Sequence, residues 1–154
     1  MSENYEEAKP KNFKFGKVGD FIKGTLLSVN KTSSPDAYGK LSMIYKVKTK
    51  EGSFIGSTKD EKTGSWSLNK EPTVITEGEE YVVFISEDKG IIIGAMSDVK
   101  IGQKFMMKFT ELKPTTKGHD AKIIKVFKGK NEDGTPLMDE KWLEENQGEN
   151  MEQF

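Results

Sequence analysis

The feature that most constrains the fold of this chain is the alternation of apolar and polar residues over short segments. Residues 41–49, LSMIYKVKT, place Met43, Tyr45 and Val47 on one face of an extended segment. Residues 101–112, IGQKFMMKFTEL, alternate in the same way. Successive side chains of a strand point to opposite faces, so a period of two residues predicts half-buried β-strands.

Further strands are predicted between turns that are rich in Gly, Pro, Asp and Ser. Gly24 interrupts the first of them and predicts a bulge or a tight bend. A turn is predicted at residues 50–52, KEG, and a short helix at residues 135–146, with Thr135 as N-cap and Pro136 in its first position. The other predicted strands are residues 20–29, 53–57, 121–129, and two around the turn SEDKG in 79–96.

Short strands in series, with no strong helical period before residue 135, predict an all-β protein. The expected architecture is an OB-fold, a five-stranded Greek-key barrel, with an extra hairpin, a short C-terminal helix and a disordered acidic tail. A small β-sandwich is the competing architecture. The expected organisation is a disordered arm (1–12), an OB-fold nucleic-acid-binding domain (13–130), and a helix and acidic tail for partner interaction (131–154). The predicted core includes Tyr45, Phe105 and Phe109, and Phe13 and Phe15 are predicted to anchor the arm.

Charge is divided unevenly along the chain. Residues 9–130 contain 23 lysines against 14 acidic residues, a net charge of +9. Residues 131–154 contain one lysine and eight acidic residues, a net charge of −7. A basic body with an acidic tail indicates a polyanionic partner and a tail that mimics it. The alternative is a tail that only aids solubility.

The composition disfavours catalysis and metal binding. The chain has no cysteine, which excludes thiolate chemistry and Cys-ligated zinc. Its single histidine, His119, lies in a polar loop, and no GxSxG, HExxH or Walker A pattern is present. We therefore expect no enzyme activity, no catalytic residues, no metal and no cofactor. All 24 basic residues are lysines, which bind phosphates as point charges and lack the fork of arginine that reads guanine.

Lysines and aromatic residues in the body fit nucleic-acid binding. Lysines that alternate with core residues share one sheet face and form a basic stripe for a phosphate backbone. Exposed rings offer stacking platforms for bases, and Trp66 in the polar segment TGSWSLNK is the best candidate. The alternatives are ordinary surface lysines, a Trp66 lid over the barrel, and a core position for Phe54. The predicted nucleic-acid-binding residues are Tyr38, Lys40, Lys46, Lys48, Phe54, Trp66, Lys104, Lys108, Lys113, Lys117, Lys122 and Lys125.

Three segments, VGDFIKGTLLSV, YGKLSMIYKVKTKEG and IGQKFMMKFTELKPTTKGHDAKIIKVF, resemble the small OB-fold single-stranded DNA-binding proteins of bacteriophages. The acidic tail that ends in an aromatic residue is similar to the tails of phage and bacterial proteins of this class. The resemblance covers residues 13–129 and the tail, and it implies sequence-independent coating of single-stranded DNA (ssDNA) during replication, recombination and repair. It also implies that the tail recruits replication or recombination proteins, through Glu144, Glu145, Glu149, Glu152 and Phe154.

Two other functions stay open. One is an OB-fold interaction module or DNA-mimicking inhibitor that acts on a host or phage enzyme, and the other is an RNA-binding OB protein. The polar N-terminus and the lack of a long apolar run predict no signal peptide and no membrane span. The expected location is therefore the cytoplasm, that of the host bacterium if the protein is viral. A monomer and a homodimer are both compatible with the sequence.

Overall fold

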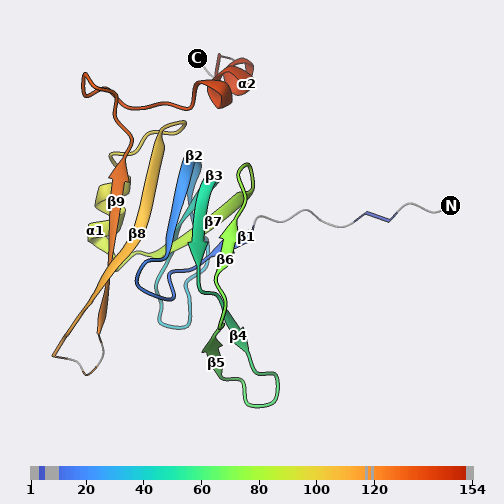
Figure 1. The fold of residues 1–154 in the computed structure, drawn as a ribbon, viewed down its shortest axis with the longest axis vertical. Helices are drawn as coiled ribbons and strands as arrows, with labels where there is room; N and C mark the ends of the chain where they lie inside the picture. Colours follow the sequence, from blue (N-terminus) through green and yellow to red (C-terminus); the bar gives the residue numbers. More distant parts are fainter. Residues whose placement is uncertain (1–3, 6–10, 117, 119, 152–154) are drawn as a thin grey trace.

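The computed structural model describes residues 4–5, 11–116, 118 and 120–151, which are mostly β-structure (Figure 1). Seven strands form one mixed sheet, two form a separate hairpin, and two short helices complete this part of the chain. The elements are β1 (Lys11–Phe13), β2 (Phe21–Lys31), β3 (Ser42–Phe54), β4 (Ser57–Lys59), β5 (Trp66–Leu68), β6 (Thr73–Ile75), β7 (Glu80–Ser86), α1 (Gly90–Met96), β8 (Lys104–Lys113), β9 (Ala121–Lys128) and α2 (Glu140–Met151).

The large sheet has the strand order β1-β7-β3-β2-β8-β9, and β6 pairs with β3 beside this path. Its pairs are antiparallel except for β1 with β7, which are parallel. β1 and β9 stand at the two ends of the order, so the hydrogen bonds between the described strands do not close a barrel. The predicted β class is confirmed, whereas a closed barrel is not found in the described residues.

β2 and β3 bend together at Gly24. Their register shifts between Lys23 and Gly24, which marks a β-bulge, and this confirms the predicted irregularity. A Cβ atom on Gly24 would clash with the carbonyl oxygen of Lys48 and would lie 2.9 Å from the Cα atom of Thr49. The two backbones therefore approach each other more closely than a side chain at residue 24 allows.

The core is formed by the inward faces of the sheet and by the N-terminal segment. The predicted core residues Tyr45, Phe105 and Phe109 are buried. Phe13 and Phe15 are buried as well, which confirms their predicted anchoring role. The Phe13 ring lies 4.7 Å from Phe15 and 4.8 Å from Phe54, centroid to centroid, so aromatic packing fixes β1 to the body.

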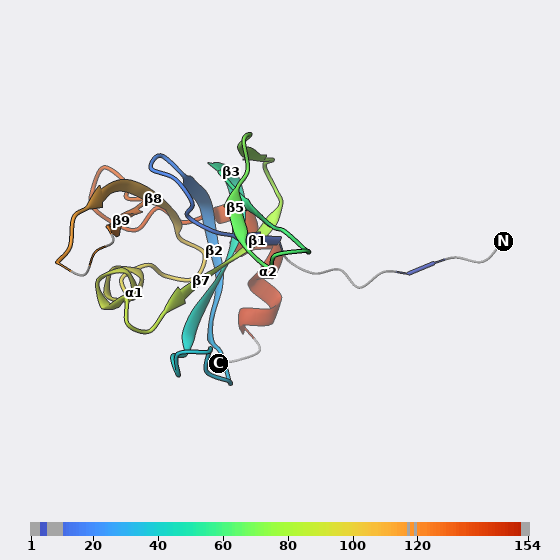
Figure 2. The same cartoon turned by 90° about the horizontal axis from the view of Figure 1, so that it is seen from below.

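Helix α1 replaces a predicted strand at residues 90–96, GIIIGAM. Ile92 and Met96 are buried in the core, whereas Ile91 is exposed. Residues four apart share one face of a helix, so the burial of this segment follows a helical period. The segment is too short, and too uniformly apolar, for its sequence to distinguish the helical period from the two-residue period of a strand. Both views place α1 beside β8 and β9 (Figure 2).

β3 runs without interruption through the turn that was predicted at residues 50–52, so that prediction is wrong. Gly52 lies inside the strand, where a Cβ atom would come within 2.8 Å of the Phe21 carbonyl oxygen and 2.7 Å of the Ile75 side chain. The glycine therefore lets β2 and β6 pack closely on β3 instead of turning the chain. Phe54 consequently ends β3 and does not open a new strand.

The segment before α2 docks on the start of β8. The Lys104 N–H donates to the Leu137 carbonyl at 2.8 Å, and the Asp139 N–H donates to the Gly102 carbonyl at 2.7 Å. A Cβ atom on Gly102 would lie within 3.3 Å of side chains from this segment and from α2. Residues 137–139 thus belong to the folded body.

A C-terminal helix is confirmed, but it begins later than predicted. Asp139 caps α2 by accepting the Trp142 N–H at 3.1 Å, a role that was expected of Thr135. The helix then continues to Met151, through residues that were expected to form a disordered tail. In the described part of the chain, no helix combines the length and the apolar character that crossing a membrane requires.

Candidate nucleic-acid interface

Two of the predicted lysines lie on either side of Thr25, at the bend of the sheet. Thr25 on β2 pairs with Lys48 on β3 and with Lys104 on β8. Paired residues on neighbouring strands point to the same side, so both lysines flank Thr25 on the outer side of the sheet. Two strand spacings separate their backbones by about 10 Å.

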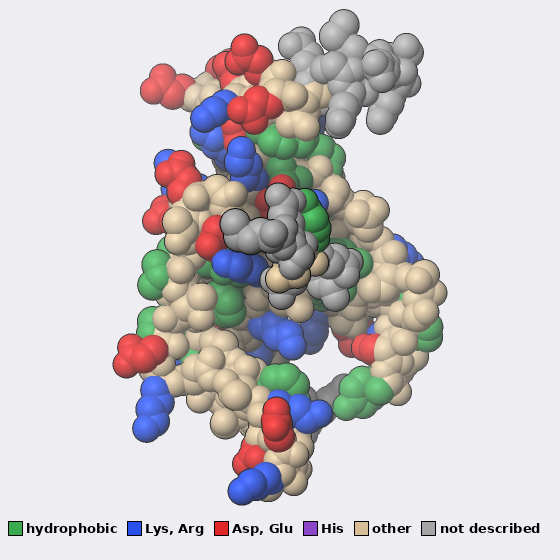
Figure 3. Space-filling model, turned by 90° about the vertical axis from the view of Figure 1, so that its right-hand side faces the viewer, with side chains coloured by type: hydrophobic (Ala, Val, Ile, Leu, Met, Phe, Trp, Pro, Cys, Tyr) green, Lys and Arg blue, Asp and Glu red, His purple; other side chains and the backbone are tan. Residues whose placement is uncertain are grey.

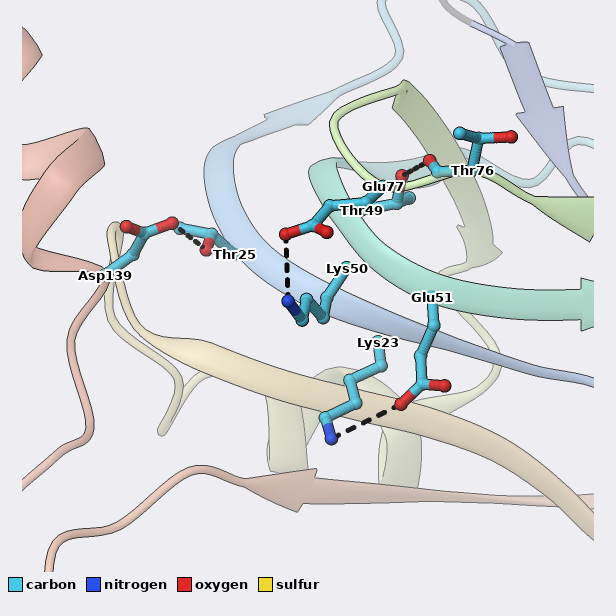
Figure 4. Close-up of polar contacts among 8 residues, drawn as sticks. All are labelled: Lys23, Thr25, Thr49, Lys50, Glu51, Thr76, Glu77 and Asp139. Carbon is cyan, nitrogen blue, oxygen red and sulfur yellow. Dashed lines mark hydrogen bonds and ion pairs between the residues drawn. The ribbon is translucent and has the colours of Figure 1, made fainter.

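A groove of 930 Å³ surrounds these residues. The close-up in Figure 4 shows the hydrogen bond between Thr25 and Asp139 and the ion pairs of Lys50 with Glu77 and of Lys23 with Glu51. The charged residues that line the groove are six lysines and two acids, a net charge of +4. They are Lys23, Lys48, Lys50, Lys104, Lys128 and Lys141, with Glu77 and Asp139.

Half of these lysines have acidic partners. The Lys50 ammonium lies 2.9 Å from Glu77, and the hydrogen bond and charge of Glu77 raise the pKa of Lys50. Lys23 lies 3.5 Å from Glu51, and Lys128 lies 4.0 Å from Asp98. Among the described residues, no ion pair engages the other three, which are Lys48, Lys104 and Lys141. The groove therefore presents cations that are available to an anion.

Asp139 places a carboxylate against these cations. It accepts a hydrogen bond from the Thr25 hydroxyl at 2.6 Å, besides the Trp142 N–H. Partial burial acts to raise the pKa of Asp139, but the two hydrogen bonds and the charges of Lys104 and Lys48 outweigh it. The pKa of Asp139 consequently lies below its usual range, and the group is ionised at neutral pH.

The outer face of β8 and β9 extends the basic surface. Lys108 on β8 and Lys125 on β9 are both exposed and lie directly opposite each other, as the predicted lysine stripe requires. Next to them, Met106 pairs with Phe127, whose side chain is 44% exposed. Phe127 was not among the predicted binding residues, although alternation with Val126 already placed its ring on the outer face with Lys125.

Several predicted lysines lie elsewhere or are engaged. Lys46 lies 3.4 Å from Glu80. Lys122 donates to the Phe15 carbonyl at 2.7 Å, which ties β9 to the N-terminal segment. Lys113 is exposed at the end of β8, and Lys117 lies outside the described residues.

The predicted aromatic platforms differ in exposure. Phe54 is only 8% exposed and packs in the core, so the structure does not present it for stacking. Tyr38 is 87% exposed, in a loop where Asp36 accepts the N–H groups of Tyr38 and Lys40. The hydrogen bonds of Asp36 thus fix the backbone of this loop, while the ring of Tyr38 faces solvent.

Trp66 is exposed but distant from the groove. Its side chain is 60% exposed on β5, and the Lys14 ammonium lies 5.5 Å from the ring centroid. The β4–β5 hairpin stands at the opposite end of the molecule from α2 (Figure 1). Trp66 is therefore no lid over the described groove, and a ligand that contacts both must extend along the body.

The acidic end of the molecule is formed by α2 and the segment before it. Figure 3 shows acidic side chains gathered at this end. Glu144 and Glu145 are exposed on α2. Glu149 lies within α2, but its side chain is outside the described part of the structure, as are Glu152 and Phe154. The predicted partner-binding residues are thus placed only in part.

No cluster of three or more His, Asp or Glu side chains suited to a metal ion occurs among the residues that the structure describes.

Comparisons with protein-family models, curated proteins and solved structures found no match to this chain. The geometry and charge of the groove are therefore the basis for the proposed function.

Proposed function

We propose that this protein binds ssDNA without sequence preference and coats it during phage DNA replication, recombination and repair. The observation that carries the proposal is the pair Lys48 and Lys104, which flank Thr25 in a groove with a net charge of +4 and have no described acidic ion-pair partner. Lysines without an ion-pair partner can neutralise the phosphates of a nucleic acid and release its counterions. No catalytic step is part of this proposal.

The strand order supports an OB-type topology. β2, β3 and β7 are successive antiparallel neighbours, and β8 returns to lie beside β2. This order, with the fourth strand next to the first, is that of a Greek key. With β9 beside β8, these five strands are compatible with the proposed OB-fold, a partly open barrel that often binds oligonucleotides.

The lysines bind phosphates as point charges, and the absence of arginine removes the usual fork for reading guanine. Exposed rings supply stacking contacts, which tolerate any base. Affinity should then fall steeply with salt, because each lysine–phosphate contact releases counterions.

Trp66 offers a direct titration signal. Trp142 is the only other tryptophan, so a Trp142→Phe variant leaves Trp66 as the single indole reporter. Stacking of a base on Trp66 is expected to quench its fluorescence as ssDNA is added at low salt. The proposal is wrong if labelled ssDNA shows no binding by anisotropy under the same conditions. Binding without quenching would remove only Trp66 from the interface.

Asp139 occupies the position at which a phosphate would meet Thr25, Lys48 and Lys104. Replacing it by asparagine removes the charge and keeps a good N-cap for α2. We expect Asp139→Asn to raise ssDNA affinity about three- to tenfold, because a carboxylate no longer competes for the lysines. Fluorescence anisotropy with a labelled oligonucleotide measures this effect. Glu132→Gln, an exposed change of equal charge, is the control. An Asp139→Asn affinity equal to or below that of the wild type would contradict the competition.

The acidic C-terminus is proposed to recruit replication or recombination proteins. Residues 137–143 are docked, so deleting residues 131–154 would damage the body as well as the tail. Deletion of residues 147–154 avoids this segment and removes Glu149, Glu152 and Phe154. We expect this deletion to abolish co-purification of replication enzymes from host extract and to preserve ssDNA affinity. Unchanged co-purification would count against recruitment by the tail.

The gathering of acidic side chains at the α2 end favours one alternative, a DNA-mimicking inhibitor that acts on a host or phage enzyme. That protein would inhibit a DNA-binding enzyme without binding ssDNA itself. An RNA-binding OB protein is the other alternative, and competition between DNA and RNA oligonucleotides of one sequence separates it.

A further inference from the structure

A methionine and a phenylalanine form an apolar step on the basic outer face of β8 and β9. Met106 and Phe127 are paired across the two strands, so their side chains lie next to each other on the same face. Their chain neighbours Met107 and Val126 point inward, Met107 fully buried and Val126 packed against the core. The ring is thus carried by anchored strands and not by a loop.

Lysines flank this step along the strands. Lys104 and Lys108 lie two residues before and after Met106 on β8, about 7 Å away along the strand. Lys125 lies two residues before Phe127 on β9 and directly opposite Lys108. Like charges at directly opposed positions destabilise a sheet, and no described acidic residue forms an ion pair with either lysine. An anion bound between Lys108 and Lys125 would relieve that repulsion.

We propose that Met106 and Phe127 form a nucleobase platform for ssDNA, with a phosphate on Lys104 at one side and a phosphate on Lys108 and Lys125 at the other. The alternation of charge, apolar surface and charge matches a chain of phosphates whose bases are free to turn inward. Duplex DNA does not fit, because its bases are already stacked and paired within the helix. This inference rests on the proposed function and adds the place where a base lies.

The test compares two oligonucleotides of equal length, one of thymidines and one of abasic sites, which keeps the phosphates and lacks the bases. The wild type is expected to bind the thymidine strand about tenfold more tightly than the abasic strand. Phe127→Leu is expected to lose most of that preference through weaker thymidine binding, with abasic binding unchanged. Phe127→Tyr should restore the preference, since it restores an aromatic ring.

Phe84→Leu is the matched control. Phe84 is 49% exposed on the outer face of β7, away from the groove lining, and is therefore similar to Phe127 in exposure. It should keep the wild-type preference for thymidine. Circular dichroism and thermal melting verify that each variant is folded.

The outcomes separate the two claims. If neither oligonucleotide binds the wild type at low salt, the proposed function fails. If both bind and Phe127→Leu keeps the full preference, or weakens both strands equally, the platform is wrong while ssDNA binding stands. Loss of the preference in Phe84→Leu instead would place the base on β7 and also overturn the inference.

Discussion

Replacing Lys48 and Lys104 together by glutamine is expected to lower the affinity for ssDNA about ten- to a hundredfold at low salt. Both lysines flank Thr25, and no described carboxylate forms an ion pair with either. Their charges act on the nearby Asp139 without such a contact. The loss should be similar for all sequences, because phosphate contacts carry no base information. Fluorescence anisotropy at several salt concentrations measures both affinity and salt dependence.

The salt dependence makes this prediction specific. Two lost phosphate contacts should reduce the slope of log affinity against log salt by about 1.4. Lys89 and Lys100 provide a control pair, since both are exposed and lie outside the groove lining. Their double replacement by glutamine changes the net charge equally. If it weakens binding as much as the groove pair does, the lysines act through overall charge and the groove is not the site.

Replacing Gly24 by alanine is expected to lower the free energy of unfolding by about 3 kcal/mol or more. The added methyl group would meet the carbonyl oxygen of Lys48 and the Cα atom of Thr49. Both are backbone atoms of β3, and they cannot move without separating β2 from β3. Urea denaturation measures the change as a lower midpoint with an unchanged slope. The groove floor is built on this bend, so ssDNA affinity should fall as well.

Gly94 is the control for this substitution. It lies in α1, and a Cβ atom there would meet nothing within 4 Å. Gly94→Ala is expected to raise the free energy of unfolding by about 0.5–1 kcal/mol, because alanine restricts the unfolded chain and favours a helix. A Gly24→Ala variant as stable as the wild type would contradict the close approach of the two strands.

Alternation predicted the β-rich part of this fold well because a period of two residues is visible within each short segment. It identified the first part of β3, the segments of β8 and β9, and the buried Tyr45 and Phe109. The bulge was predicted from the isolated Gly24 instead. Alternation also placed Lys104, Lys108 and Lys125 on an outer face. Lys48 and Lys104 are 56 positions apart, and both lie beside Thr25 only because β8 pairs with β2, which no local pattern contains.

Other features depended on tertiary contacts that the sequence does not reveal. Residues 90–96 form a helix because they pack beside β9, although isoleucine favours strands. Asp139 caps α2 because residues 137–139 dock on β8, whereas Thr135 had the better local signal. Phe127 is different, since alternation with Val126 already placed it on the outer face with Lys125, whereas its pairing with Met106 depends on the register of β8 and β9.

The groove is proposed to bind single-stranded DNA through phosphates and bases. The most direct test of this proposal is anisotropy titration of the wild-type protein with one labelled oligonucleotide, single-stranded and in duplex form, at about 50 mM and about 200 mM salt. We predict clear preference for the single strand at low salt and a steep loss of affinity at the higher concentration. No binding at low salt, or equal affinity for both forms, would overturn the proposed function.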